Sequence, residues 1–166
     1  IDEAINKNPK NISYKYLQVK ILADEGWKDK AQKEAEDIKK SVILTDFYAK
    51  KYKEIEEYIL YKNTKNERLK NYHLAYYHYN RDDYLRSLKV MPMANAKNKK
   101  ENSKIYALIR QNYVALKEYE KASLNAQKSY KLNRKNPDAL ILLGDLAYGK
   151  RDYKGALKFY KEAMSY

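Results

Sequence analysis

The 166-residue chain contains no cysteine. Without that residue it can form no disulfide, present no thiolate nucleophile and build no cysteine-based zinc site, which removes several enzyme classes. The redox environment stays open, because a chain without cysteine survives in any compartment. No apolar run in the sequence approaches the roughly 20 residues that a membrane-spanning helix needs.

Glycine and proline are also scarce, with 4 and 3 residues respectively. This composition fits helices joined by short turns and leaves no room for a long flexible linker. Hydrophobic residues make up 44% of the chain and recur at helical spacing, without the alternating runs typical of strands. We therefore predict a single all-α domain over residues 1–166.

Signals for chemistry are nearly absent. The only histidines, His73 and His78, lie five residues apart, so on a helix they point about 140° away from each other and cannot share a metal ion. The sequence has no glycine loop for phosphate and no serine in a nucleophile elbow. We predict that the chain is not an enzyme, and that it has no catalytic residue, no metal site and no cofactor.

The formal charge of +13 arises from 35 Lys and Arg against 22 Asp and Glu. Such a charge, with 19 tyrosines, suits nucleic acid or another anionic surface. The basic residues are nevertheless spread along every predicted helix beside acidic ones, as on a solvated face. The densest cluster, Lys97, Lys99, Lys100 and Lys104, falls in a connection and includes Glu101. The abundance of Lys, Asn, Ile and Tyr also fits an AT-rich genome, which raises basic charge without a partner.

The last third of the chain repeats itself. A set of four residues is followed by a matching set, each member 34 residues further on: Ile109, Tyr113, Tyr119 and Ala122, then Leu143, Ala147, Tyr153 and Ala156. A period of 34 residues is typical of a helix-turn-helix unit that stacks on copies of itself to bury its apolar face.

The last copy shows the pattern most fully. Asn136 to Ala139 opens a first helix, and Leu143 with Gly144 provides the apolar and small residues at the helix crossing. Arg151 to Tyr153 forms the turn. Ala156, Tyr160 and Ala163 follow on the second helix as its buried stripe.

These residues resemble the tetratricopeptide repeat (TPR) family. The resemblance implies an α-solenoid of antiparallel helix hairpins, with about eight or nine helices here and an irregular N-terminal half. It also implies that an aromatic residue after each turn wedges between neighbouring helices. Residues 103–136 fit less closely, because Arg110 stands where the family prefers a small residue.

Weaker copies lie upstream. Residues 66–101 repeat the crossing with Leu74 and Ala75 and the turn with Asp83 and Tyr84, and Pro92 predicts a bend or break near Met91. Residues 12–45 form a degenerate repeat, in which one stripe of the first helix and one of the second flank a turn at Asp24 to Gly26. These stripes are Tyr14, Leu17 and Ile21, then Ala31, Ala35 and Ile38. Residues 1–11, with Ala4, Ile5 and Asn8-Pro9, resemble the end of a preceding repeat, and residues 137–166 form the last one.

One further helix breaks the alternation. Phe47, Tyr48, Tyr52, Ile55 and Ile59 recur at helical spacing and predict a helix over residues 46–62. Either this helix is an insertion or the phase assigned to the first repeat is wrong.

If the chain resembles the family in curvature, the first helices line a concave groove. The groove residues are then Leu69, Tyr72, Tyr76, Tyr79, Asn80, Lys104, Ala107, Gln111, Val114, Ile141, Asp145 and Tyr148. This surface is aromatic and weakly charged, which suits a helix or an extended peptide. The family's clamp for chaperone tails is absent, because Tyr72, Tyr76, Leu108, Asp138 and Leu142 occupy its positions.

The sequence thus predicts a non-catalytic scaffold that binds a partner protein in the aromatic groove, where lysines at the rim would favour an acidic partner. Two alternatives stay open: nucleic-acid or anionic-surface binding through distributed Lys and Arg, and a structural or homodimerisation module. Because the chain begins at Ile1, we expect it to be a fragment of a longer bacterial protein whose signal or anchor segment is not in this sequence. The resemblance leans weakly towards the cell envelope.

Overall fold

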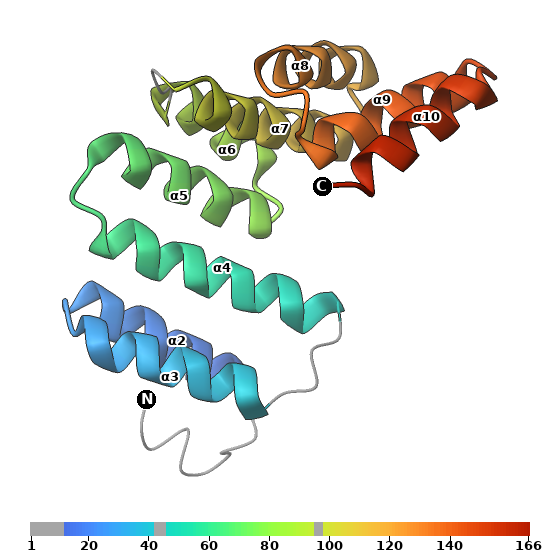
Figure 1. The fold of residues 1–166 in the computed structure, drawn as a ribbon. Coiled ribbons are helices and arrows are strands. Elements are labelled where there is room, and N and C mark those ends of the chain that lie inside the picture. The colour runs from blue at the N-terminus through green and yellow to red at the C-terminus, as the bar shows by residue number, and fades with distance from the viewer. Residues whose placement is uncertain (1–11, 42–45, 95–97) are drawn as a thin grey trace. The chain divides into compact units, whose positions relative to one another are not determined.

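A computed structural model describes residues 12–41, 46–94 and 98–166 (Figure 1). These residues contain nine α-helices, one short 3-10 helix and no strand, which confirms the predicted all-α fold. The α-helices are α2 (Ile12–Asp24), α3 (Lys28–Ser41), α4 (Asp46–Asn63), α5 (Glu67–Asn80), α6 (Tyr84–Val90), α7 (Lys99–Ala115), α8 (Tyr119–Leu132), α9 (Pro137–Gly149) and α10 (Tyr153–Ala163). The expectations for residues 1–11 and for Lys97 lie outside the described residues.

The chain divides into two compact units. The first unit ends at Val90 and contains α2 to α6, whereas the second begins at Met91 and contains η1 (Met91–Ala94) and α7 to α10. The unit boundary coincides with the end of α6, where η1 carries Pro92. This confirms the predicted break near Met91, because proline cannot continue an α-helix without losing a backbone hydrogen bond.

In the first unit, α4 is the central helix. It packs against the α2–α3 hairpin on one side and against α5 on the other, and α5 packs against α6 (Figure 1). As predicted, α4 buries Tyr52, Ile55 and Ile59. The side chains of Phe47 and Tyr48 lie outside the described part of the chain. The predicted helix over residues 46–62 therefore contributes side chains to this hydrophobic core.

The apolar face of α3 is also confirmed, since Ala31, Ala35 and Ile38 are no more than 2% exposed. The face predicted for α2 is wrong. Its buried stripe consists of Tyr16, Val19 and Ala23, whereas the predicted Tyr14, Leu17 and Ile21 are exposed. Helix α2 carries apolar side chains on two opposite faces, so the sequence offered two stripes of equal spacing and the packing uses the other one.

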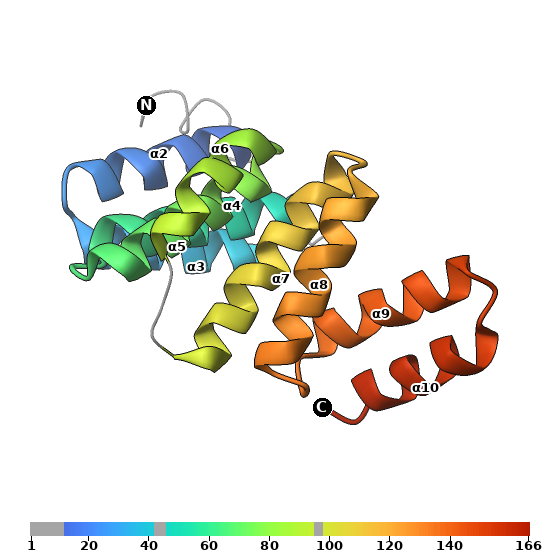
Figure 2. The same cartoon turned by 90° about the horizontal axis from the view of Figure 1, so that it is seen from above.

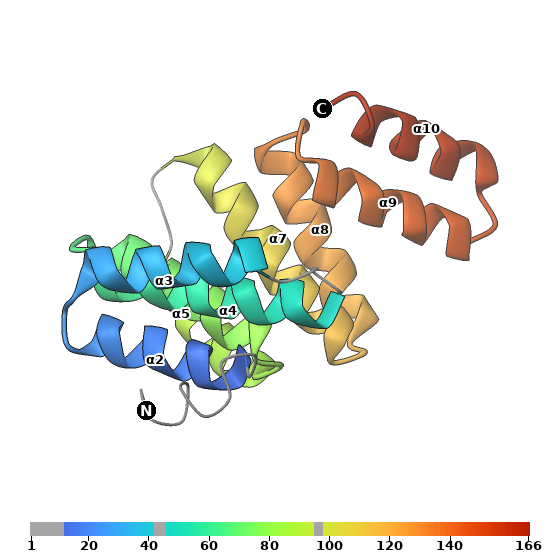
Figure 3. The ribbon, with the colours of Figure 1, turned by 90° about the horizontal axis from the view of Figure 1, so that it is seen from below.

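In the second unit, α7 pairs with α8, α8 packs against α9, and α9 pairs with α10. Figures 2 and 3 show α9 and α10 side by side as an antiparallel hairpin. A buried polar triangle joins three of these elements. Ser103 Oγ donates to the Ser129 carbonyl (2.9 Å), Ser129 Oγ donates to the Ser103 carbonyl (2.8 Å), and Asn136 Nδ2 donates to both hydroxyl oxygens. The Asn136 side chain also caps α9 by accepting from Asp138 N (3.1 Å).

The same backbone turn closes four hairpins. The second residue after the end of each first helix has a positive φ. These residues are Gly26 (78°), Asp82 (61°), Lys117 (60°) and Arg151 (63°). The N–H of each donates to the carbonyl three residues back, and the next N–H donates to the carbonyl five residues before it. This is the Schellman pattern, which satisfies the last free carbonyls of a helix and reverses the chain. The three later positions are 35 and 34 residues apart, the predicted spacing.

Each of the four turns joins two consecutive helices. They join α2 to α3, α5 to α6, α7 to α8 and α9 to α10. The connection from α4 to α5 lacks this turn and has instead a single bond from Thr64 N to the Leu60 carbonyl (2.9 Å). The first hairpin therefore shares its turn with the later ones, whereas α4 and α5 pack against each other without it.

A small buried residue recurs five positions after each positive-φ residue, on the second helix of the hairpin. These residues are Ala31, Ser87, Ala122 and Ala156, all at most 2% exposed. Because their side chains are short, the two helices of each hairpin can approach closely at this level. The predicted small residues Ala156 and Ala122 are thus confirmed as contact points, and so is Ala163, whereas Tyr160 is only half-buried.

The aromatic residue after the turn does not behave uniformly. Tyr84 is half-buried, but Tyr119 and Tyr153 are 62% and 59% exposed. The expected wedge between neighbouring helices is therefore wrong for Tyr119 and Tyr153. The tyrosine hydroxyl favours the surface at these positions, and the Tyr153 ring meets Tyr148 edge to face instead (5.4 Å between ring centres).

Gly144 provides a direct test of close packing between α9 and α10. A Cβ placed there would come within 2.4 Å of the Tyr160 ring, whose hydroxyl donates to Asp145 Oδ1 (2.7 Å). Gly144→Ala should force the ring away and lower the free energy of unfolding by about 1–3 kcal/mol in urea denaturation.

The matched control is Gly149→Ala at the end of α9, where a Cβ meets nothing within 4 Å. That variant should be unchanged or up to about 1 kcal/mol more stable, since alanine is the better helix former. Equal stability of the two variants would contradict the packing described here.

The buried polar triangle predicts a second stability difference. Asn136→Ala removes a helix cap and two buried hydrogen bonds, so the free energy of unfolding should fall by about 2–3 kcal/mol. Asn133→Ala, which removes only the contact to Lys135 N (3.2 Å), should cost about 0.5 kcal/mol. Thermal and urea unfolding of both variants measure the difference, and a loss as large for Asn133→Ala would argue against the triangle.

Candidate protein-binding surfaces

Five of the predicted groove residues lie on α5 in the first unit. Leu69 is 37% exposed, whereas Tyr72, Tyr76, Tyr79 and Asn80 are half-buried. The rings of Tyr72 and Tyr76 meet edge to face with centres 4.9 Å apart, and Asn80 Nδ2 donates to the Tyr76 carbonyl (2.9 Å). These contacts hold the aromatic rings of α5 in place.

The other predicted groove residues lie on α7 and α9 in the second unit. On α7, Lys104 and Val114 are exposed and Gln111 is half-buried. Ala107 is only 3% exposed, so its predicted place in a groove is wrong: the small side chain is part of the core. All three predicted groove residues on α9 are exposed. They are Ile141 (43%), Asp145 and Tyr148 (61%).

Two tyrosine pairs occupy equivalent places beside two of the turns. The rings of Tyr79 and Tyr84 contact each other at a tilt in the first unit (5.7 Å between centres), and those of Tyr148 and Tyr153 meet edge to face in the second (5.4 Å). Each pair joins the end of a first helix to the start of a second. The pairs give both units a rigid aromatic surface next to the hairpin turn.

Sequence reasoning missed the outer surface of the α2–α3 hairpin. Trp27 is 55% exposed there, beside Leu17 (49%) and Ile21 (43%). An open hollow of about 720 Å³ lies between the two helices, with a rim that mixes acidic and basic side chains; it is lined by Gln18, Ile21, Leu22, Glu25, Trp27, Lys30, Lys33 and Glu34. The signal that could have revealed it is the second apolar stripe of α2.

A cluster of tyrosines and charged groups links α2, α4 and α5. Lys20 Nζ donates to the Tyr77 hydroxyl (3.0 Å) and lies 5.0 Å from the centre of the Tyr58 ring. Tyr58 donates to Asp24 (2.5 Å), and Lys62 pairs with the same carboxylate (2.7 Å). The Lys62 and Tyr58 hydrogen bonds hold the pKa of Asp24 below its usual range, whereas burial followed by the Asp24 contact raises the pKa of Tyr58. Every member of the cluster has a partner within it, so it stabilises the unit.

The two histidines face different carboxylates. His73 Nδ1 lies 2.8 Å from Glu57 of α4, and His78 Nδ1 lies 3.8 Å from Asp83 in the α5–α6 turn. Among the residues that the structure describes, no group of three or more His, Asp or Glu side chains is arranged to hold a metal ion. In the same ranges, no helix has the length and apolar character to cross a membrane.

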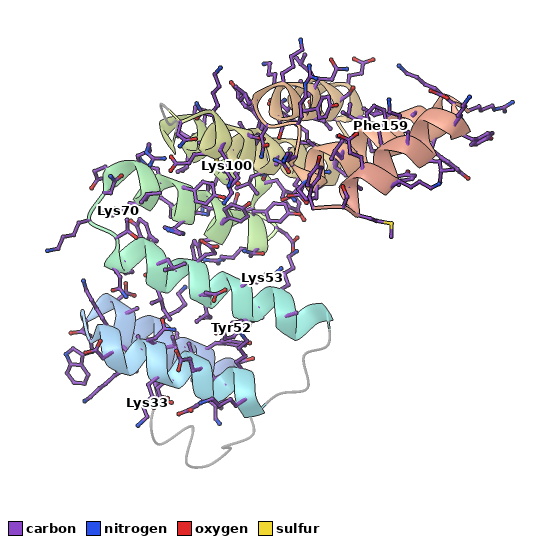
Figure 4. The ribbon with its side chains drawn as sticks, in the orientation of Figure 1. Lys33, Tyr52, Lys53, Lys70, Lys100 and Phe159 are labelled. Carbon is purple, nitrogen blue, oxygen red and sulfur yellow. The ribbon has the colours of Figure 1, made fainter. Side chains whose placement is uncertain are left out.

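Figure 4 shows how the side chains cover the ribbon. Lys33 on α3 and Lys53 on α4 are exposed, whereas Phe159 on α10 is half-buried and meets Tyr130 edge to face at 6.4 Å.

The surfaces of the two units differ most in charge. Residues 91–166 contain 16 Lys and Arg against 7 Asp and Glu, a net charge of +9 out of the total of +13.

The fold and these surfaces define an all-α protein of repeated antiparallel helix hairpins with exposed aromatic positions. Models of known protein families give no match to this chain, and no curated protein matches it either.

The environment of His78 predicts a pH dependence of stability. Burial lowers the pKa of His78. The nearby carboxylate of Asp83 acts in the opposite direction, whereas the positive charges of Arg86 and Arg81 lower the pKa further. Below the ordinary pKa of about 6.5, the unfolded chain therefore binds a proton that the folded chain does not, and stability falls as the pH falls from 6.5 towards the folded pKa.

Chemical denaturation at pH 7.5, 6.5 and 5.5 should show this decrease, and His78→Gln should reduce it. The histidine variant His73→Gln serves as the control and should keep the decrease due to His78. Because the chain has only two histidines, few other groups titrate in this range. A pH profile that is the same in His78→Gln and in the parent would contradict the assignment.

Proposed function

We propose that this chain is a non-catalytic interaction module of the tetratricopeptide-repeat kind that binds a partner protein through aromatic side chains on its first helices. The observation that carries the proposal is the hairpin turn that recurs at 34- and 35-residue spacing, with exposed or half-exposed apolar side chains at equivalent first-helix positions. Tyr79, Val114 and Tyr148 hold one such position, each three residues before the positive-φ residue.

The chemistry of these positions favours recognition. Tyr148 is 61% exposed and its ring is held by Tyr153, so a partner can bury it without first ordering it. Rigid, exposed aromatic residues are the side chains that most often dominate binding energy at protein interfaces. Exposed lysines such as Lys104, itself one of the predicted groove residues, would raise the association rate of an acidic partner.

The proposal is tested with two double variants of exposed residues. Ile141→Ala/Tyr148→Ala removes two predicted anchors on the first helix α9. Leu85→Ala/Leu124→Ala removes two apolar side chains on the second helices α6 and α8, which are 71% and 53% exposed. All four residues are accessible, so both variants should retain the helical circular dichroism of the parent.

Affinity capture from a bacterial lysate followed by mass spectrometry should give a partner that the parent and the Leu85/Leu124 variant enrich equally. The Ile141/Tyr148 variant should lose it, with a dissociation constant raised at least about tenfold in titration calorimetry. Equal binding by both double variants would exclude the first helix α9 as the binding surface.

A further inference from the structure

Helix α10 has a buried face and an outer face of very different character. Its buried face contains Ala156 and Ala163, with the half-buried Phe159 and Tyr160 beside them. Phe159 contacts Tyr130 of α8, and Tyr160 contacts Asp145 of α9. These contacts fix which side of α10 faces the rest of the second unit.

The outer face carries a line of large apolar side chains. Tyr153, Leu157 and Met164 are 59%, 54% and 87% exposed. At about 100° per residue, Leu157 and Met164 lie within about 40° of Tyr153 around the helix axis. Met164 has helical backbone angles (φ −70°, ψ −13°), so it continues the line beyond the last residue of α10.

Lysines flank this line on one side. Lys154, Lys158 and Lys161 recur at spacings of four and three residues and are all exposed. Lys150 and Arg151 extend the positive charge into the α9–α10 turn. We call Tyr153, Leu157, Met164, Lys154, Lys158 and Lys161 the α10 outer face.

The acidic residues of the same segment are placed elsewhere. Asp152 caps α10, where its side chain accepts from Gly155 N (2.9 Å), and Glu162 is half-buried. The outer face therefore combines exposed apolar groups with uncompensated positive charge, in the unit that carries +9 of the net charge.

We propose that the α10 outer face docks on the surface of an anionic lipid bilayer. Helices with this pattern lie in the plane of the membrane interface, with apolar side chains between the lipid headgroups and lysines against the phosphates. Side chains that are more than half exposed stand out from the helix and suit insertion into a soft, flat surface. This inference does not depend on the proposed protein partner, because it rests on side chains of α10 and on Met164, although Tyr153 also contacts Tyr148 of α9.

Co-sedimentation of the full chain with lipid vesicles tests the proposal. The parent should pellet with vesicles of phosphatidylcholine and phosphatidylglycerol and remain in solution with phosphatidylcholine alone. Leu157→Ser/Met164→Ser should weaken binding to the anionic vesicles about tenfold. Lys154→Gln/Lys158→Gln/Lys161→Gln should weaken it by about fivefold per lysine.

Two matched controls make the result specific. Lys28→Gln/Lys33→Gln/Lys53→Gln removes the same charge from exposed positions of the first unit, and Leu85→Ser/Leu124→Ser removes two exposed apolar side chains from other helices. Both should bind anionic vesicles within about threefold of the parent, and circular dichroism verifies that every variant is folded.

Three results would overturn the proposal. The first is no pelleting of the parent with anionic vesicles. The second is equal loss in the α10 lysine variant and the first-unit lysine variant, which would mean adsorption by overall charge. The third is binding of soluble poly-L-glutamate that depends on the α10 outer face while vesicles do not bind, which would identify an acidic protein as its partner.

Discussion

The structure of each hairpin depends on one backbone conformation, the positive φ of the residue that follows its first helix. This conformation turns two N–H groups back onto the last carbonyls of the helix, so the chain reverses with few unsatisfied polar groups. Glycine adopts it freely at position 26, but Asp82, Lys117 and Arg151 do so at a cost of about 1 kcal/mol each. In each hairpin a small buried residue lies five positions later, where the second helix packs closely against the first.

Much of this arrangement could be predicted from the sequence, because the period of 34 residues and the small residues at the crossings are local signals. The break near Met91 followed from the chemistry of Pro92 alone. The orientation of α2 could not be predicted in the same way. Its two apolar stripes have equal spacing, and only the contacts with α3 and α4 select Tyr16 and Val19 over Tyr14 and Leu17.

The burial of single side chains was harder to predict, for a physical reason. Sequence spacing places a residue on a face of a helix, but it does not tell how far the neighbouring helix covers that face. Ala107 became part of the core, and Tyr153 remained at the surface although the resemblance implied that it is wedged inside. The turn at Gly26 has the same two hydrogen bonds as the later turns, a similarity that the sequence spacing did not reveal.

The distribution of charge separates the two units in their chemistry. The first unit contains nearly balanced charges, many of them paired in the cluster around Tyr58 and Tyr77, which links three helices. The second unit carries most of the positive charge, and α10 presents Lys154, Lys158 and Lys161 beside exposed apolar side chains. Protein recognition on α9 and lipid contact on α10 would therefore use adjacent helices of one hairpin. The rings of Tyr148 on α9 and Tyr153 on α10 meet edge to face where the two helices join.

Backbone resonance assignment by nuclear magnetic resonance would test the repeated turn most directly, since chemical shifts and coupling constants report φ at each residue. We expect positive φ at Asp82, Lys117 and Arg151 as well as at Gly26, together with slow hydrogen exchange of the two donor N–H groups in each turn. Negative φ at the three non-glycine positions would contradict the common hairpin and the pairing of α5 with α6.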